Sequence, residues 1–320
     1  MENAEKYFLL AVEEMNFTRA AKRAYVTQQC LSKNIQQLEN RLQVELFQRE
    51  PKLALTPAGR MLYETLRRVE LLENEFHSRL ELVRQDNSGL LRLGINSSRG
   101  QVLLPTVYER YQKIYPNILV SVTLDDIVGL EKKLLDNQLD LFLGVNCESK
   151  TYLQVETVAR DQIFLLATDA FLRKYMTGRK VEGRLASGDT LELQDFAVLP
   201  LAENRQGSTV AAVCQRFLQQ RGITAISKIQ VSDYATQIAV CGKSLAAAFC
   251  PQSLLSLVAD YNSHSIDKLM AFHVAGLDET VNLSLVRPQR ENMPEVINVF
   301  LEVMRQVIHE NELFTYGMIK

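Results

Sequence analysis

A row of polar side chains near the N-terminus has the residue types and the spacing needed to read bases in DNA. Its five members lie on one face of a helix that is expected to begin after residue 27: Gln28, Gln29, Ser32, Lys33 and Gln36. No acidic residue lies among them, whereas exposed helices usually mix Glu with Lys. Glutamine can pair bidentately with adenine, lysine can reach guanine, and serine can bond to base edges or phosphate. The row therefore favours a DNA-reading surface over the alternative, an ordinary solvated helix face.

Three short helices are expected to position this row. Apolar residues recur at helical spacing from Ala4 to Met15, which indicates a first helix. A second begins around Phe17 with Thr18 as its N-cap, and a third follows with Thr27 as its N-cap. The third helix is expected to bury a stripe opposite the polar row: Leu31, Ile35, Leu38 and Leu42. Two helices joined by a short turn, the second carrying base-reading side chains, form a helix-turn-helix.

The segment 46–56 is predicted to form a strand, a turn and a second strand, with Pro51 at the tip. Arg49 and Lys52 flank that tip and are available to phosphates. Thr56 then caps a new helix that has Pro57 at its first position. A hairpin that follows a helix-turn-helix is a wing, so the N-terminal domain is predicted to be a winged helix-turn-helix.

The charge of the chain is divided unevenly. Residues 15–60 contain eight Lys and Arg residues against three Glu residues, a net charge of +5. The whole chain carries a formal net charge of −2, so the remainder carries −7. A basic head on an acidic body indicates that the head alone meets a polyanion.

A long helix is expected from residue 57 to about residue 86, because neither Gly nor Pro interrupts the chain after Gly59. Its apolar residues recur at intervals of four and three, interrupted by Glu73: Leu62, Leu66, Val69, Phe76, Leu80 and Val83. A helix of roughly 30 residues spans about 45 Å, too far to bury such a stripe in a compact domain. The stripe therefore predicts a partner helix, the alternative being a long helix that lies on its own body.

From residue 89 onward, strands and helices alternate. Strands are predicted at 90–95, 118–124, 139–144, 163–167, 196–199, 226–231, 245–249, 269–274 and 281–286, with a last helix at 294–310. This alternation argues for a parallel α/β sheet with right-handed crossovers. The segment from Arg173 to Asp189 is rich in basic residues and glycine, and it is predicted to be an exposed surface loop.

The segment from Phe17 to Glu64 resembles the N-terminal domain of LysR-type transcriptional regulators. The resemblance rests on the FTRAA run, the VTQ..LS start of the recognition helix, the LE..L..ELF exit and the LTPAG junction between wing and linker. The chain departs from the family at Gln29-Cys30, where Pro-Ala is often found, and at Lys33, where Arg is common. The resemblance places Gln28, Gln29, Ser32 and Lys33 at contacting positions. The complete set of candidate DNA contacts is Thr18, Arg19, Thr27, Gln28, Gln29, Ser32, Lys33, Gln36, Arg49 and Lys52.

The resemblance covers essentially the whole chain and implies an α/β multidomain protein. Its expected parts are a winged helix-turn-helix at 1–58, a linker and dimerisation helix at 59–88, and an effector-binding domain at 89–320. That domain is expected to have two lobes like those of periplasmic binding proteins, lobe one at 89–160 plus 268–320 and lobe two at 161–267. The implied partners are double-stranded DNA with an inverted-repeat operator, a small-molecule effector, further copies of the chain in a dimer or tetramer, and RNA polymerase.

Candidate effector contacts follow the first strand of lobe one. Ser97 and Ser98 open a helix whose free backbone amides suit a carboxylate or phosphate, and Arg99 adds charge; simple N-capping by either serine is the alternative. The equivalent positions in lobe two are Gln206, Ser208 and Thr209. By resemblance, three more residues line the cleft: Ile127, Val145 and Asp233. The first two stand where several acid-sensing relatives carry Thr and Arg, which indicates a more apolar effector.

Enzyme motifs are missing from the sequence. GxSxG, HExxH and GxGxxG do not occur, and Gly242-Lys243-Ser244 lacks the leading glycine of a phosphate loop because residue 237 is Gln. The four His residues are scattered, so no metal site and no cofactor are expected. The five Cys residues are odd in number and never spaced as CxxC, which fits a reducing cytoplasm, and Cys241 and Cys250 are predicted to be buried.

No apolar stretch approaches the length of a membrane span and the N-terminus has no apolar leader, so a cytoplasmic protein without a membrane partner is expected. The sequence favours a ligand-responsive transcription regulator that is not an enzyme. Two alternatives stay open. One is an α/β solute-binding or enzymatic protein with an incidental helical head, and the other is a regulator switched by protein partners instead of a small ligand.

Overall fold

The structure, a computed structural model, describes residues 2–48, 52–84, 89–176, 185–196, 198–204, 208–223, 225–289 and 293–319. Within the helix at 57–84, the side chains at 71, 74, 75 and 77–84 are also left out of the description. Several predictions therefore lie outside the described residues: Arg49 as a phosphate contact, Gln206 as a cleft residue, the side chains of Leu80 and Val83, and segment 177–184 of the basic stretch.

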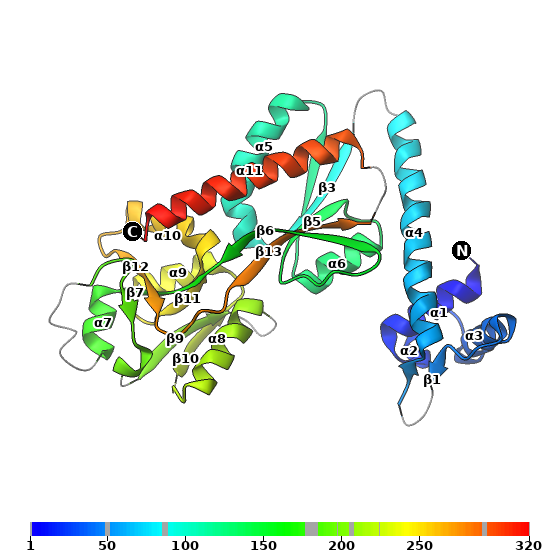
Figure 1. Ribbon diagram of the computed structural model, residues 1–320, viewed down its shortest axis with the longest axis horizontal. Coiled ribbons are helices and arrows are strands. Elements are labelled where there is room, and N and C mark those ends of the chain that lie inside the picture. The colour runs from blue at the N-terminus through cyan, green and yellow to red at the C-terminus, as the bar shows by residue number, and fades with distance from the viewer. Residues whose placement is uncertain are drawn as a thin grey trace.

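The N-terminal head forms because three amphipathic helices bury their apolar faces against one another and against a two-stranded wing (Figure 1). Phe8, Leu31, Ile35 and Phe47 are buried in its core. In the wing, Phe47 pairs with Leu55 in antiparallel register. The elements are α1 Asn3–Glu14, α2 Phe17–Arg23, α3 Gln28–Leu42, β1 Phe47–Gln48 and β2 Ala54–Leu55. The predicted winged helix-turn-helix is confirmed.

Two of the three predicted N-caps are confirmed. The Thr27 hydroxyl accepts a hydrogen bond from the N–H three residues later (3.2 Å), and the Thr56 hydroxyl does the same (3.0 Å). The prediction that Thr18 caps α2 is wrong, because the Asn16 side chain accepts from the N–H of Thr18 (2.9 Å) and of the next residue (3.0 Å). Both Asn and Thr are favoured N-caps, so the local pattern does not decide between them. Leu42, predicted to be buried, is exposed at the end of α3.

The linker helix α4, Pro57–Arg84, packs on the head at its first turns and then leaves it (Figure 1). Leu66 is buried in the head core. Gly59 lies so close to the wing that a Cβ there would be 2.1 Å from the Leu46 carbonyl oxygen. The 28 residues of the helix span about 42 Å at the standard helical rise. Further along, described apolar side chains are exposed: Val69 37%, Leu72 61% and Phe76 60%.

Lobe one is built on a five-stranded sheet with the order β4-β3-β5-β13-β6 (Figure 1). β3 is parallel to β4 and β5, but β13 is antiparallel to β5 and β6, so the prediction of a parallel sheet is wrong for this half of it. Helices connect the parallel strands because parallel pairing needs a long crossover. The elements are β3 Leu90–Ile95, α5 Ser97–Ile114, β4 Leu119–Leu124, α6 Ile127–Leu135, β5 Leu141–Val145, β6 Leu153–Asp161 and β13 Val281–Pro288.

Lobe two has a four-stranded sheet with the order β11-β7-β12-β8 and a parallel pair, β9 and β10. An isolated bridge between Leu201 and Ala247 connects the two. The elements are β7 Ile163–Thr168, α7 Asp169–Tyr175, β8 Thr190–Leu191, η2 Leu193–Asp195, β9 Leu199–Asn204, α8 Thr209–Gln220, β10 Ala225–Val231, α9 Tyr234–Gly242, β11 Ala248–Pro251, η3 Gln252–Leu254, α10 Leu255–His264 and β12 Leu269–Val274. The loop prediction beginning at Arg173 is wrong at its start, because Arg173 and Lys174 belong to α7.

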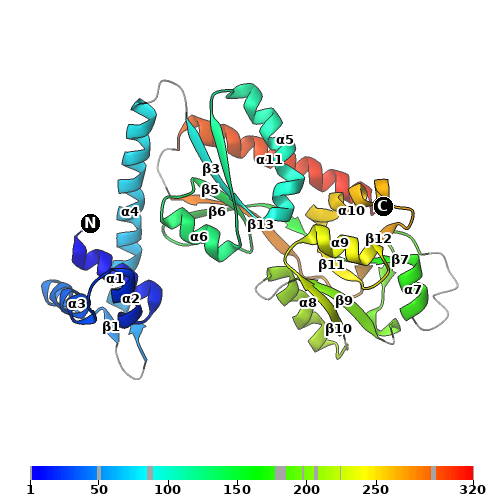
Figure 2. The same cartoon turned by 180° about the vertical axis from the view of Figure 1, so that it is seen from behind.

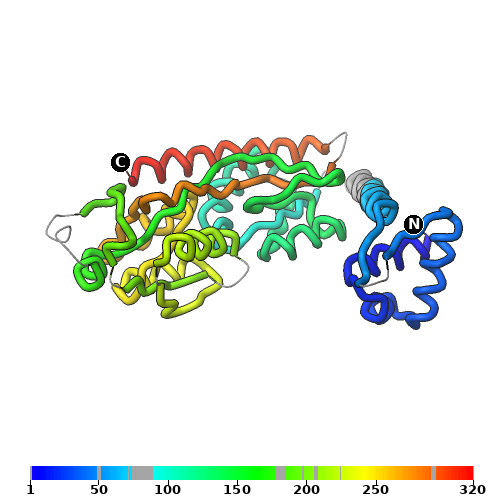
Figure 3. Tube along the Cα trace, turned by 60° about the horizontal axis from the view of Figure 1, so that its bottom comes forward, coloured from blue at the N-terminus to red at the C-terminus, as the bar shows by residue number. Residues whose placement is uncertain are grey.

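Two strand crossings and one long helix connect the lobes. β6 leads into β7 and β12 into β13, while α11, Glu295–Gly317, extends along both lobes (Figure 3). α11 also packs against α5 of lobe one (Figure 2). The predicted lobe boundary at residue 268 is wrong by one strand, because β12 pairs with β7 in lobe two. The chain returns to lobe one only after Val274.

A buried ionic contact holds the lobes together beside these crossings. Arg99 at the start of α5 donates to Asp161 at the end of β6 (3.0 Å), and both residues are 3% exposed. The Asp161 carboxylate also accepts from the N–H (3.0 Å) and hydroxyl (2.6 Å) of Ser253 in lobe two. The Ser253 carbonyl in turn accepts from the Asn311 side chain of α11 (2.9 Å). One carboxylate thus joins both lobes at their hinge.

Replacing that carboxylate should destabilise the effector domain. Asp161→Asn keeps the shape of the side chain but leaves the buried Arg99 cation unpaired, so we expect the free energy of unfolding to fall by about 3 kcal/mol. Urea denaturation of the full-length protein, followed by circular dichroism, measures the loss. The matched control is Asp169→Asn, which breaks an exposed ion pair with Arg173 and should change little. A loss for Asp161→Asn no larger than the control's would contradict the structural role of this contact.

Candidate DNA interface and inter-lobe cleft

The polar row on α3 faces away from the head. Leu31, Ile35 and Leu38 of the same helix fill the core, so the opposite face is directed to solvent. Ser32 is half-buried. The other four members of the row are exposed: Gln28, Gln29, Lys33 and Gln36. Within the described part of the chain no segment covers them. A helix that projects its N-terminal polar residues in this way can lie in a major groove.

A hydrogen bond within the head orients the first side chain of the row. The Thr18 hydroxyl donates to the Gln28 side-chain oxygen (3.2 Å). The Gln28 amide nitrogen is thereby left to donate outward, to acceptors such as guanine O6, purine N7 or phosphate. The Gln29 and Lys33 side chains make no hydrogen bond or ion pair to the described residues, so their polar groups stay available to a ligand.

The predicted phosphate contacts lie at the edges of this face. Arg19, in the first turn of α2, is exposed, and its guanidinium donates to the Glu14 carbonyl oxygen (2.6 Å). Its Nε lies 3.5 Å from the Glu14 carboxylate. Lys52, after the wing tip, is also exposed. Thr27 is exposed, but its hydroxyl is already engaged as the N-cap of α3.

A cavity of about 460 Å³ lies between the two lobes. The N-termini of four helices meet there, α5 and α6 from lobe one and α8 and α9 from lobe two. Seven of the nine predicted effector contacts line it: Ser97, Ser98, Arg99, Ile127, Val145, Ser208 and Thr209. Gln206 lies outside the described residues. Asp233 is not among the residues that line this cavity; its carboxylate caps α9 (2.8 Å to the Thr236 N–H), and its neighbours Ser232 and Tyr234 line the cavity.

The serines at the start of α5 do not act as its N-cap, contrary to the alternative considered from the sequence. Asn96 caps the helix by accepting from the Arg99 N–H (2.8 Å). Ser98 instead accepts a hydrogen bond across the cleft from the Tyr234 N–H (3.1 Å). Ser97 is exposed and lines the cavity. The start of α5 is therefore both a wall of the cavity and a direct contact between the lobes.

The charges around the cavity are uneven. Asp126 and Asp233 cap α6 and α9, so acidic groups offset the positive ends of those helices. Neutral side chains, Asn96 and Ser208, cap α5 and α8, which leaves their positive ends favourable to an anion. The prediction that Arg99 adds free charge to the site is not supported, because Asp161 neutralises it. Apolar side chains supply part of the wall: Leu124, Ile127, Val128, Leu143, Val145 and Val210.

Sequence reasoning missed several cavity residues, of which Tyr234 is the largest. Burial raises the pKa of the Tyr234 phenol, so it stays protonated and can donate a hydrogen bond. Asn204 at the end of β9 also lines the cavity. The end of a strand and the start of a helix are general signals for ligand residues in α/β folds, and they would have indicated both positions.

Three of the five cysteines lie in lobe two and are buried. Cys241 and Cys250 are buried as predicted, and Cys214 is buried as well. Burial raises the pKa of each of these thiols, that of Cys241 to about 12. Protonated, buried thiols are poor nucleophiles. Among the described residues no cluster of three or more His, Cys, Asp or Glu side chains is arranged to hold a metal ion. No helix in the described ranges is both long and apolar enough to cross a bilayer.

Comparisons with known proteins agree with the fold. Residues 3–60 match the family model for bacterial regulatory helix-turn-helix proteins of the lysR family, and residues 84–308 match the LysR substrate binding domain. An uncharacterized HTH-type transcriptional regulator of Methanocaldococcus jannaschii is 23% identical over 94% of this chain and 97% of its own length. A probable RuBisCO transcriptional regulator of Thalassiosira pseudonana is 30% identical over 68% of this chain and 69% of its own.

A solved structure of full-length CbnR in complex with its target DNA has the same fold, with a TM-score of 0.52 and 21% identity. The superposition covers 96% of this chain and 100% of that one. The helix-turn-helix head, the long linker and the two-lobed domain thus occur together in both proteins. The two family models cover most of the chain, one on each side of the linker helix. The chain belongs to the LysR family of transcriptional regulators, with a DNA-binding head and an effector-binding domain.

Proposed function

We propose that this regulator reads an inverted repeat as a dimer and is switched by a small molecule that binds between its lobes. It acts in the cytoplasm and has no enzymatic activity. The observation that carries the proposal is the polar face of α3, which is exposed while the opposite face of the same helix fills the core of the head. The fold neighbour CbnR was solved on its target DNA, which supports the same use of the head here.

Dimerisation through α4 accounts for the exposed stripe on that helix. Val69, Leu72 and Phe76 are exposed on α4 in a single copy of the chain. Packing two such helices side by side would bury the stripe and place two copies of α3 around a dyad. Two recognition helices related by a dyad read two half-sites about one helical turn apart. A tetramer would join two such dimers.

The polar row sets what each half-site must offer. Gln28 presents its amide nitrogen as a donor, because Thr18 occupies its oxygen. Gln29 has both groups available and can pair bidentately with adenine, while Lys33 can reach guanine or phosphate. Arg19 and Lys52 meet the backbone on either side. RNA polymerase would then respond to the arrangement of heads on the promoter.

The cavity is suited to a small molecule with an anionic group and an apolar part. The positive ends of α5 and α8 favour a carboxylate or phosphate, and Ser97 and Thr209 offer hydroxyls beside them. Ile127 and Val145 offer apolar contact. Because the cavity walls come from both lobes, a ligand that contacts both shifts the population towards one inter-lobe arrangement.

Removing two members of the polar row should abolish selective DNA binding. We expect Gln29→Ala combined with Lys33→Ala to weaken the preference for a selected duplex over random duplex by about tenfold or more, since each good base contact contributes 1–3 kcal/mol of discrimination. The duplex is obtained by selection from a randomised pool with the wild-type protein, and affinities are measured by fluorescence anisotropy at fixed salt. Lys6→Ala with Gln138→Ala removes the same two side-chain types elsewhere. If the two double variants prefer the selected duplex over random duplex to the same degree, the assigned interface is contradicted.

A thermal-shift screen of small carboxylates and phosphates with apolar tails tests the cavity. A ligand should raise the melting temperature, because binding to the folded state alone stabilises it. Ser97→Ala should then weaken its affinity about tenfold, the effect of losing a hydrogen bond to a charged group. The control is Ser227→Ala, an exposed serine on β10 outside the cavity. Stabilisation unaffected by Ser97→Ala would place the ligand elsewhere, and a screen without any ligand would favour switching by a protein partner.

A further inference from the structure

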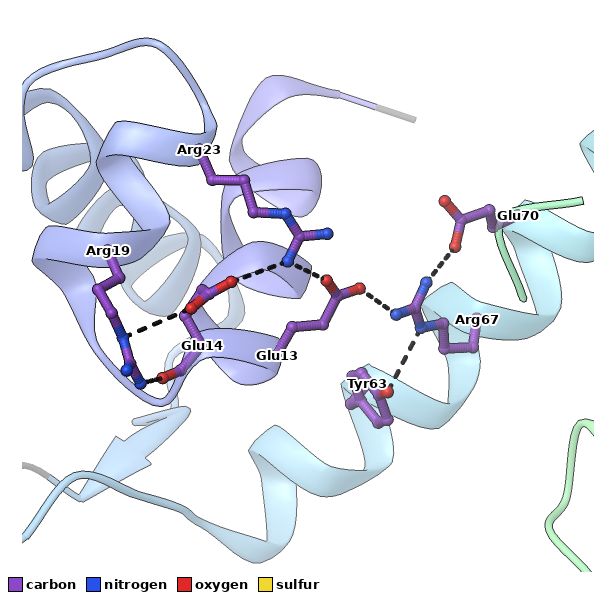
Figure 4. A network of polar contacts seen from close by, with 7 residues as sticks. All are labelled: Glu13, Glu14, Arg19, Arg23, Tyr63, Arg67 and Glu70. Atoms are coloured by element: carbon purple, nitrogen blue, oxygen red, sulfur yellow. Dashed lines mark hydrogen bonds and ion pairs between the residues drawn. The ribbon is translucent and has the colours of Figure 1, made fainter. Parts of the chain in front are cut away.

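The linker helix carries a buried cation that the expected dimer stripe does not explain. Arg67 is 4% exposed, and each of its three guanidinium nitrogens donates to a different partner (Figure 4). Nη2 donates to Glu13 of α1, Nη1 to Glu70 (2.7 Å) and Nε to the Tyr63 hydroxyl (3.4 Å). A buried guanidinium with all its groups engaged holds its partners in one geometry, because releasing any of them leaves an unpaired charge.

From Arg67 the polar contacts continue into the head. Glu13 also pairs with Arg23 of α2 (2.5 Å), and Arg23 pairs with Glu14 (3.1 Å) (Figure 4). The Glu14 carboxylate and carbonyl oxygen hold Arg19, the residue placed at the DNA backbone. Two glutamates and three arginines thus form one chain of contacts from the linker helix to the edge of the DNA-facing surface.

The same helical turns also touch lobe one. The Tyr152 ring stands edge-on to Tyr63, with ring centroids 6.5 Å apart. The Thr151 hydroxyl donates to the Glu64 carboxylate (3.4 Å), and α6 contacts α4. Residues 63–70 of α4 are therefore the place where the head, the linker and lobe one meet.

The charges of the three parts act on one another at this place. Burial raises the pKa of Glu70; Arg67 lowers it, whereas Asp136 at the end of α6 and Glu13 of the head raise it further. Burial likewise raises the pKa of Asp136, and Glu13 adds to the rise while Arg67, Lys132 and Arg23 oppose it. An acidic group of lobe one therefore lies within electrostatic range of an acidic group of the head, and the buried Arg67 cation opposes the rise in pKa of both Glu70 and Asp136.

We propose that Arg67 is a positioning residue for DNA binding: it fixes the head against the linker helix at the turns that lobe one contacts, and thereby sets the distance between the two recognition helices of a dimer. The proposal rests on the proposed function. Arg67 itself is buried and does not touch DNA. Its role is to hold α1 on α4 at the turn that lobe one contacts, so that a movement of lobe one reaches Arg19 and α3 as a rotation of the whole head.

Arg67→Met removes the cation but keeps a long apolar side chain. Arg67→Lys keeps the charge but loses the planar guanidinium that donates to three partners at once. Arg68→Met is the matched control, because Arg68 is the next residue and is exposed. The probes are three duplexes built from the sequence that the wild-type protein selects. One carries a single half-site, one the complete inverted repeat, and one the repeat with five base pairs inserted, which turns one half-site by about half a helical turn.

We expect Arg67→Met to bind the single half-site within about twofold of wild type, because α3 is untouched and distant effects are small. Its preference for the natural over the extended repeat should fall from about tenfold or more to about twofold, as expected when the heads are no longer held at one distance. The preference of Arg67→Lys for the natural repeat should lie between that of wild type and that of Arg67→Met. Arg68→Met should show the same preference as wild type.

Three results would overturn the proposal. If Arg67→Met loses affinity equally for the half-site and the full repeat, Arg67 only maintains the fold of the head. If Arg67→Met keeps the wild-type preference for the natural over the extended repeat, Arg67 does not position the heads. Tyr152→Leu, which acts from lobe one and leaves the head intact, should relax the spacing preference as well; unchanged spacing in a folded Tyr152→Leu protein would remove lobe one from the junction. If wild type selects no duplex at all, the proposed function itself fails.

Discussion

The two faces of α3 impose the constraint on which the rest of the structure depends. One face fills the head with Leu31, Ile35 and Leu38, and the other must therefore face outward with amides, a hydroxyl and an ammonium group. A short amphipathic helix of this kind is too small to bind selectively alone, because one half-site holds few base pairs. Dimerisation through the exposed apolar stripe of α4 would add a second head. The two-lobed domain is the part of the chain that can change how the two heads are arranged.

Local patterns in the sequence predict the elements of this fold better than they predict its sheets. The bounds of β3 and β12 match the expected ones, because each is a short run of mostly apolar residues of strand length. Strand partners depend on contacts far apart in the chain, so the assignment of β12 to lobe one was wrong and the antiparallel half of the first sheet was missed. β6 alternates weakly and carries charged residues along the inter-lobe crossing, so the sequence pattern does not indicate a strand there.

The candidate sites show the same division. Ser97 and Thr209 are predicted as ligand contacts because strand ends and helix N-termini are general ligand sites, and both line the cavity. The roles of charged residues were not found, since they depend on partners distant in sequence. Arg99 is predicted at the ligand and lines the cavity, but its charge is paired with Asp161, 62 residues away. The partner of Arg67, Glu13, lies 54 residues away, and no local pattern indicates the pair. Both charges serve junctions between parts of the chain, the first between lobes and the second between head and linker.

Photo-cross-linking from position 29 tests most directly whether the outward face of α3 reads base edges. A photoreactive amino acid replaces Gln29 in the full-length protein, and the cross-linked nucleotide is mapped on the duplex that the protein selects. If α3 lies in the major groove, cross-links should fall on the bases of each half-site and occur at two places related by the operator dyad. Cross-links only to the protein's own chain, or scattered along the duplex without preference for the half-sites, would contradict the account.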